Sequence, residues 1–308
     1  MRETGMTEIL MKAGSFVAII IMGYMLRRKG FFKEEDFYVL SRIVLKITLP
    51  AAIVTNFTGI DLKPSMLLMS MLGLGGGVLL VGIAFLISAG KSGGEKAFNI
   101  VNLSGYNIGN FTMPFAQGFL GPMGVVATSL FDSGNALVCL GGAYSVAVMA
   151  KGEKNKFSVM PIIKTLLLSV PFDAYLLMTI LSLLHLTLPA PVVSFTGIIA
   201  NGNAFMAMLM LGVGFKMTLD KSRMGKIITI LSIRYAVSIA LAAAFYFLLP
   251  FGLEYRQALT ILALSPIASA APAFTADLRG DIGLSSAINS ISIVISIVLI
   301  TGTLLVIL

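Results

Sequence analysis

The sequence predicts an all-helical membrane protein with ten transmembrane helices, arranged as two inverted five-helix repeats. Three observations lead to this fold class: an apolar composition, ten apolar stretches, and a pattern of Gly, Pro and Asn that recurs in the second half. Of the 308 residues, 57% are hydrophobic and 12% are charged, and the mean hydropathy is +0.96. Soluble domains are about 45–50% apolar and roughly 25% charged, so an ordinary soluble enzyme, a disordered chain and a secreted disulfide scaffold are excluded.

The predicted spans follow one another without a segment long enough for a soluble domain. Each is close to or longer than the ~20 residues that a membrane helix needs. The first precedes Arg27, Arg28 and Lys29 and lacks a small-residue cleavage site, which indicates a retained helix rather than a signal peptide. In the sixth, Pro171 marks a second start, so 157–169 is interpreted as an interfacial amphipathic helix. The spans are 9–26, 37–57, 65–89, 97–119, 123–149, 161–185, 190–215, 227–249, 254–276 and 282–307.

The basic residues predict the orientation. Of the 22 Lys and Arg residues, 14 lie in the links that follow odd-numbered spans and four lie on the opposite side with both termini. Basic residues gather in cytoplasmic loops, so both termini are expected outside a multi-pass protein of the cell membrane. The longest cytoplasmic link, 150–160, divides the chain into a first half, 1–149, and a second half, 161–308. The positive charge is thus a topology signal rather than a nucleic-acid site.

Matching residues in the two halves predict the inverted repeat. Each half has a proline in its fourth span, a Gly-x-x-Gly pair just after it, and then a long apolar span with an internal amide. The prolines are 158 residues apart and the glycines 159. Because each half has an odd number of spans, the second half is inverted. The residues are Pro114 and Pro272, Gly121 and Gly124 with Gly280 and Gly283, and Asn135 and Asn289.

The two prolines predict interrupted membrane helices. Proline cannot donate the helical hydrogen bond and clashes with the preceding turn, and main-chain groups freed in this way cannot be left in lipid. They survive where they line a cavity or bond to a solute. Matching broken helices in inverted repeats are typical of the binding site of a secondary transporter.

Three motifs resemble those of the auxin efflux carrier family of bacterial and plant membrane transporters. They are Leu49-Pro50-Ala51 in span 2, Gly-Asn-x-x-x-Pro-Phe at Gly109–Phe115 in span 4, and Phe131-Asp-Ser-Gly-Asn135 in span 5. The resemblance covers essentially the whole chain. Span 4 has Asn107 and Asn110 without the Asn-Pro-Asn motif of plant members, so the resemblance does not name the substrate.

The resemblance implies a crossover fold shared with bile acid and sodium–proton transporters. Spans 4 and 9 would cross where they are broken. Spans 3–5 and 8–10 would form a transport domain, and spans 1, 2, 6 and 7 a scaffold, often in a homodimer. The resemblance also implies a small organic anion as substrate and places substrate contact on the amide of Asn110.

Candidate substrate-binding residues are polar side chains and prolines near the expected crossover, with two amides on the scaffold. They are Asn107, Asn110, Thr112, Pro114, Ser265, Ser269, Pro272, Asn56 and Asn203. Their alternative role is to cap broken helix ends. The coupling-ion candidates are Asp132, Asn135 and Asn289.

Asp132 lies inside span 5, where an acid is costly and is a functional candidate by default. It could bind a proton or a sodium ion, with Asn135 on the same helical face. Arg234, in span 8, could snorkel, pair with an acid or offer countercharge to an anionic substrate. Cys139 and His185 are the only residues of their kinds, so no metal site, cofactor or hydrolase triad is expected.

We therefore expect a secondary transporter for a small organic anion, in particular a carboxylate, rather than an enzyme. No ATP-binding motif is present, so a solute gradient, the membrane potential or a coupled ion must drive it. The alternatives are a sodium- or proton-coupled transporter of the bile-acid-symporter type, a passive channel, and an intramembrane aspartyl protease that uses Asp132 and Asp173.

Overall fold

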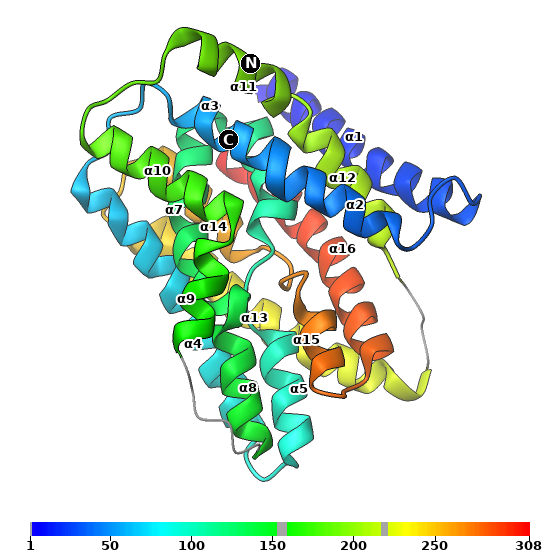
Figure 1. The fold of residues 1–308 in the computed structure, drawn as a ribbon. Helices are drawn as coiled ribbons and strands as arrows, with labels where there is room; N and C mark the ends of the chain where they lie inside the picture. The colour runs from blue at the N-terminus through cyan, green and yellow to red at the C-terminus, as the bar shows by residue number, and fades with distance from the viewer. Residues whose placement is uncertain (1, 153–158, 217–220) are drawn as a thin grey trace.

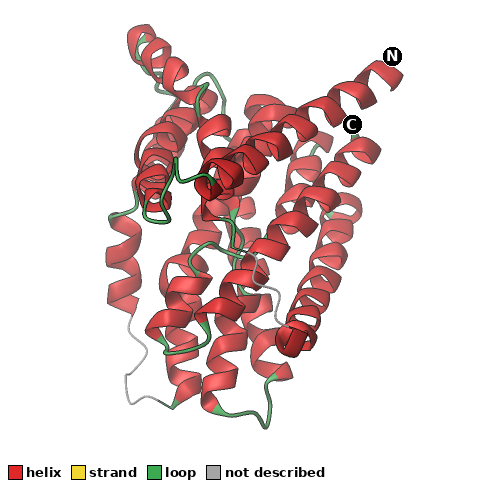
Figure 2. Cartoon of the chain, turned by 90° about the vertical axis from the view of Figure 1, so that its right-hand side faces the viewer, coloured by secondary structure: helices red, strands yellow, loops and turns green. Residues whose placement is uncertain are grey.

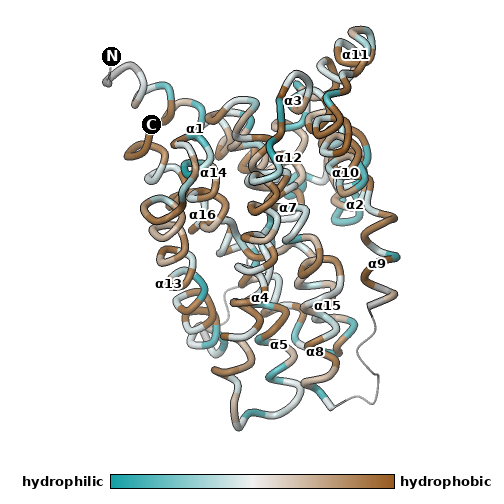
Figure 3. Tube along the Cα trace, turned by 90° about the vertical axis from the view of Figure 1, so that its left-hand side faces the viewer, coloured by the Kyte–Doolittle hydropathy of each residue, from teal (hydrophilic) through white to brown (hydrophobic). Residues whose placement is uncertain are grey.

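The computed structural model describes residues 2–152, 159–216 and 221–308, and every regular element in these ranges is a helix (Figure 2). Both termini lie at the same end of the helical assembly (Figure 1). Apolar residues run along most of the helices (Figure 3), and many large side chains on their outer faces are exposed, among them Leu86, Phe247 and Leu248. The chain is therefore a polytopic membrane protein, whose outward apolar side chains are suited to contact lipid.

The first half contains long helices divided by short 3-10 or π segments, which are labelled η. Its elements are α1 (Arg2–Arg28), α2 (Asp36–Ile43), η1 (Val44–Thr48), α3 (Leu49–Phe57), η2 (Pro64–Leu67), α4 (Leu68–Ile87), α5 (Gly93–Leu103), η3 (Ile108–Thr112), α6 (Met113–Phe115), η4 (Ala116–Leu120), α7 (Gly121–Leu137), η5 (Val138–Gly142) and α8 (Ala143–Lys151).

The second half has fewer divisions. Its elements are α9 (Val159–Leu167), α10 (Val170–Leu183), α11 (Ala190–Ala200), α12 (Asn203–Gly214), η6 (Lys221–Arg223), α13 (Met224–Leu248), α14 (Leu253–Ala263), α15 (Ala271–Asp277) and α16 (Ile282–Ile307). Residues 157 and 158 of the expected amphipathic helix lie outside the described residues, and α9 covers most of the remainder.

Local sequence explains several helix ends. Ser92 accepts a hydrogen bond from the Glu95 N–H at the start of α5, and Asp281 accepts one from the Leu284 N–H at the start of α16. Both side chains satisfy a first-turn donor that has no partner within the helix. α8 ends before Gly152, which has a φ of +84° that glycine adopts without strain.

Within the described residues, seven helical stretches are long and apolar enough to cross a membrane. They are Gly5–Arg28, Asp36–Phe57, Pro64–Ile87, Gly93–Lys151, Ala190–Gly214, Met224–Leu248 and Ile282–Ile307. The fourth stretch has 59 residues and contains the fourth and fifth predicted spans. The sixth and ninth predicted spans are absent from the set because α10 has 14 residues and because α14 and α15 are separate short helices.

The first interruption lies earlier in the chain than Pro114, where the sequence predicted it. Residues 104–107 separate α5 from η3, and Gly105 in this break has a φ of +72°. Pro114 instead lies inside the continuous helical run formed by η3, α6 and η4, where π segments flank it on both sides. The second interruption, 264–270, precedes α15, and Pro272 lies in the first turn of that helix.

The two interruptions meet inside the molecule (Figure 1). The Asn107 N–H donates a hydrogen bond of 2.9 Å to the Pro266 carbonyl, which joins the two breaks directly. The Thr112 and Ser265 hydroxyls lie 2.6 Å apart, next to this bond. These contacts satisfy main-chain and side-chain groups that have no helical partner, and they bring both halves of the chain to one place.

Glycines bring α4 and α7 into close contact. A Cβ atom added to Gly134 would lie 1.8 Å from the Ser70 carbonyl oxygen, and one added to Gly73 would lie 2.0 Å from the Phe131 carbonyl oxygen. The Gly73-Leu-Gly-Gly-Gly77 run therefore serves helix packing, as small residues commonly do in membrane helices.

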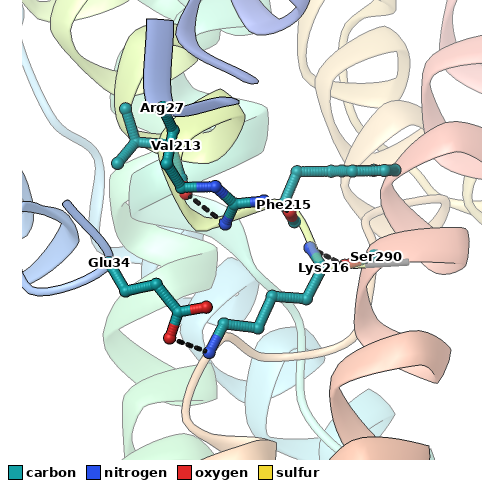
Figure 4. Close-up of polar contacts among 6 residues, drawn as sticks. All are labelled: Arg27, Glu34, Val213, Phe215, Lys216 and Ser290. Carbon is teal, nitrogen blue, oxygen red and sulfur yellow. Dashed lines mark hydrogen bonds and ion pairs between the residues drawn. The ribbon is translucent and has the colours of Figure 1, made fainter. Parts of the chain in front are cut away.

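A polar cluster joins the ends of α1 and α12 to α16 (Figure 4). Arg27 donates to the Val213 and Phe215 carbonyls at 2.7 and 2.6 Å. Lys216 pairs with Glu34 at 2.8 Å, and its main-chain N–H donates to the Ser290 hydroxyl at 3.0 Å. The hydrogen bond and the positive charge of Lys216 lower the pKa of Glu34 from its ordinary value of 4.5.

Acidification should weaken this cluster. An acid whose pKa is lowered in the folded state adds stability above its unfolded pKa and loses that contribution as the pH falls through the folded value. The effect is small, about 0–1 kcal/mol, because the pair is exposed. We expect Glu34→Gln to be slightly less stable than wild type near neutral pH, with the difference disappearing as the pH falls below 4.5. Thermal unfolding over this pH range measures it.

Glu35→Gln is the matched control, because the exposed Glu35 forms no ion pair with a described residue. A difference between wild type and Glu34→Gln that grew on acidification would contradict the prediction.

Candidate functional site

A cavity of about 540 Å³ lies where the two interrupted helices meet. Its walls come from both breaks, from α2 and η1, from α7, and from α9 and α10. Among its polar lining residues are Asn107, Asn110, Asp132, Asn135 and Ser269, all of which are predicted site residues. The volume is within the range of about 300–1,000 Å³ that is typical of small-molecule sites.

Asp132 is held by neutral hydrogen-bond donors from two helices. Asn135, one turn later on α7, donates to Oδ1 at 2.9 Å, and the Tyr175 hydroxyl on α10 donates to Oδ2 at 2.9 Å. No basic side chain in the described part of the chain forms an ion pair with this half-buried carboxylate. The arrangement can hold a carboxylate or, after a rotation of one hydroxyl or amide partner, a carboxylic acid.

Asn135 also forms hydrogen bonds with the main chain of the first break. Its Oδ1 accepts a hydrogen bond from the Tyr106 N–H at 3.0 Å, and its Nδ2 donates to the Tyr106 carbonyl at 2.9 Å. Asn289 on α16 has a comparable role at the second break, where it donates to the Ile267 and Ala268 carbonyls at 3.1 and 3.2 Å. These amides replace the main-chain partners that the interrupted helices lack.

Two amide groups in the cavity wall have unused hydrogen-bonding atoms. Asn110 donates to the Ser269 hydroxyl at 3.2 Å, but its Oδ1 has no partner among the described residues. The Nδ2 of Asn107 has none either. Buried polar atoms are usually hydrogen-bonded. Both residues line the cavity, so its wall keeps one unused acceptor and one unused donor.

The other predicted site residues do not line the cavity. Thr112 and Ser265 bond to one another, Pro114 lies inside the helical run 108–120, and Pro272 lies in the first turn of α15. Asn56 donates to the Ala52 carbonyl of its own helix. Asn203 is completely buried and bonds to Thr48 and Gln117. Asn289 donates hydrogen bonds to the main chain of the second break.

Sequence reasoning missed Tyr175 and interpreted Arg234 differently. Tyr175 lines the cavity and contacts Asp132, but no local motif marks it in α10. Arg234 is completely buried and donates to the Leu103 and Ser265 carbonyls, so it neither snorkels nor pairs with an acid. Asp173, two residues before Tyr175, is exposed and does not line the cavity.

No group of three or more His, Cys, Asp or Glu side chains is placed to hold a metal ion within the residues that the structure describes. The cavity presents main-chain ends, amides, hydroxyls, one carboxylate and the Cys139 thiol as its polar groups, with Lys46 among its remaining lining residues. This set of groups can bind a polar solute and a proton.

Comparison with known proteins supports a transporter. No protein-family model matches the chain. The chain is 25% identical over 301 residues to a protein of Methanothermobacter thermautotrophicus that is named an uncharacterized transporter, and the match covers 96% of each chain. Together with the apolar helices, this full-length similarity supports a multi-pass membrane transporter and argues against an enzyme.

Proposed function

We propose that this protein is a secondary transporter that moves a small organic anion, in particular a carboxylate, across the cell membrane by alternating access. The observation that carries the proposal is the meeting of two interrupted helices at a cavity with unused amide groups. Main-chain polarity inside a membrane is tolerated where it lines such a cavity, and broken helices of this kind form transporter sites. The full-length similarity to a named transporter supports the same general function.

The finer part of the proposal is a fold of ten spans in two inverted repeats. The interrupted helices occupy comparable places in the two halves, and in each half the following long helix supplies an amide to the break. Asn135 and Asn289 are these amides. The resemblance to auxin efflux carriers adds the division into a scaffold (spans 1, 2, 6 and 7) and a transport domain (spans 3–5 and 8–10). A homodimer is a further proposal from that resemblance.

Within this architecture the cavity would open toward the cytoplasm. Phe37 and Tyr38, at the start of α2, and Thr165, in α9, are among its lining residues. Both helices follow basic links, 27–36 and 150–160, which the charge pattern assigns to the cytoplasmic side. With both termini outside, the structure would correspond to an inward-facing state.

The side chains that line the cavity favour binding of an anion together with a proton. Lys46 and the Asn107 amide offer a positive charge and a donor, whereas Asp132 would repel an anion when ionised. Protonation of Asp132 removes this repulsion, so solute and proton would bind together. Sodium coupling of the bile-acid-symporter type is the alternative, because the same carboxylate could bind a cation.

The first test is binding and transport of organic acids. Purified protein should show a thermal shift with at least one small carboxylate, and reconstituted vesicles should show saturable counterflow of that compound. Measurements at acidic and neutral pH, with and without sodium, identify the coupling ion. A panel of mono- and dicarboxylates without any shift or flux would refute the anion proposal, and non-saturable flux would indicate a channel.

Asp132→Asn should remove the pH dependence of uptake. Asparagine keeps an oxygen that can accept from Asn135, but it cannot bind and release a proton. Uptake of the compound found above, measured across a pH series in vesicles, tests this expectation.

Asp173→Asn is the matched control, because Asp173 is exposed and outside the cavity. It should keep the wild-type pH profile. A wild-type profile in Asp132→Asn would exclude Asp132 as the coupling group. Cleavage of a transmembrane peptide that both substitutions abolished would instead support a protease.

A further inference from the structure

Arg234 is a buried charge in the middle of a membrane-spanning helix, α13, with no exposed surface. Its two terminal nitrogens donate to main-chain carbonyls, Nη1 to Leu103 at 2.9 Å and Nη2 to Ser265 at 3.2 Å. It forms no ion pair with a carboxylate in the part of the chain that the structure describes. A charge in such a place is costly, so the contacts that retain it indicate its function.

The two carbonyls belong to the ends of two different broken helices. Leu103 is the last residue of α5, and Ser265 follows the last residue of α14, Ala263, by two positions. Because each helix stops there, its last carbonyls have no N–H partner from a following turn. The same helix ends carry a partial negative charge, which a cation stabilises. The one side chain of Arg234 therefore supplies hydrogen bonds and a positive charge to both C-terminal ends.

Arg234 lies behind the cavity wall. Its guanidinium carbon lies 4.4 Å from the centre of the Tyr106 ring. Tyr106 lines the cavity and Arg234 does not. The charge is thus separated from the solute site by an aromatic ring on which it stacks favourably. It is placed to act on the helix ends rather than on a bound anion.

We propose that Arg234 is a positioning residue that acts as the built-in cation of the crossover, holding the C-terminal ends of α5 and α14 together at the place where a bound metal cation would otherwise be needed. The Leu103 and Ser265 carbonyls would then need no sodium ion, whatever ion Asp132 binds. The inference rests on the proposed crossover site for its effect on transport, but its physical basis can be tested without knowing the solute.

The test is rescue of stability by a free cation. Arg234→Ala should have a lower unfolding temperature than wild type in detergent, because two buried carbonyls lose their donor. Guanidinium chloride, at concentrations far below those that denature proteins, should raise this temperature in a saturable manner. Wild type should not respond, and tetramethylammonium chloride, which has no N–H donor, should not rescue the variant.

Arg27→Ala is the matched control. Arg27 also donates to two carbonyls at the end of a helix, those of Val213 and Phe215, but it is only half-buried (Figure 4). Water can replace its guanidinium group, so the free cation should give no saturable gain. Equal responses of Arg27→Ala and Arg234→Ala would overturn the proposal.

A second pair of variants covers the case in which Arg234→Ala does not fold. Arg234→Lys keeps the charge, whereas Arg234→Met keeps a long apolar stem without it. The Lys variant should give more folded protein and a higher unfolding temperature than the Met variant. Equal behaviour of the two, or an Arg234→Ala variant that folds and ignores guanidinium, would overturn the proposal. Neither result depends on the organic-acid screen, so failure here is distinct from failure of the transport proposal.

Discussion

Replacing Gly134 by alanine is expected to prevent the normal packing of α7 against α4. The new Cβ would lie 1.8 Å from the Ser70 carbonyl oxygen, an atom of the main chain that cannot rotate away. The two helices would have to separate along the contact that positions Asp132 and Asn135. Overpacking commonly costs about 1–3 kcal/mol, and a clash with a rigid main chain should lie at or above the upper end. Thermal unfolding and gel filtration in detergent measure the loss.

Gly75→Ala on α4 provides the control, since nothing lies within 4 Å of its added Cβ. It should equal or slightly exceed wild type in stability, because alanine favours a helix by about 0.5–1 kcal/mol relative to glycine. If both alanine variants behaved alike, the close contact between α4 and α7 would not exist in the protein.

Asn135→Ala should have the second large effect. It removes the acceptor of the Tyr106 N–H and a donor to Asp132, and it leaves the Tyr106 carbonyl with only the Ile108 N–H and the Cys139 thiol as donors among the described residues. An unsatisfied buried group costs about 1–3 kcal/mol. The Tyr106 N–H becomes such a group, and hydrogen bonds to the Tyr106 carbonyl and to Asp132 are lost as well, so a loss near the upper end of this range is expected. The break that forms one wall of the cavity should lose its fixed shape, and binding of the organic acid should be lost with it. Unfolding and thermal-shift titration measure the two effects.

Asn56→Ala is the appropriate comparison, because among the described residues the Asn56 side chain bonds only to the Ala52 carbonyl of its own helix. We expect a change within about 0.5 kcal/mol, as for substitutions away from such networks. Solute binding that survived in Asn135→Ala but not in Asn56→Ala would move the site away from the first break and toward the scaffold.

Hydropathy was sufficient to predict the helical membrane class, because lipid requires long apolar helices and leaves a strong signal in composition. The position of the first break was harder to predict. Pro114 is the strongest local helix breaker in span 4, yet it lies inside a continuous helical run between two π segments, and the chain turns instead at Gly105. A glycine in a glycine-rich membrane chain carries little information by itself.

The predicted site residues that line the cavity are those that a motif or an intramembrane polar residue marked in the sequence. Asn107, Asn110, Asp132, Asn135 and Ser269 all reach one cavity. Tyr175 could not be found in this way, because its contact with Asp132 depends on which face of α10 packs against α7. The carbonyl partners of Arg234 could not be predicted either, because they come from two segments that are distant in the sequence.

The bond between the two breaks has a consequence for biosynthesis. A ribosome releases residue 107 long before residue 266, so the first interrupted helix enters the bilayer without the carbonyl that later accepts its N–H. Arg234, too, is made after the helix end that it caps. Until then, the free main-chain groups of the first break must bond to water, to the insertion machinery or to neighbouring spans. Final assembly of the first half is therefore a late event, completed by the arrival of the second.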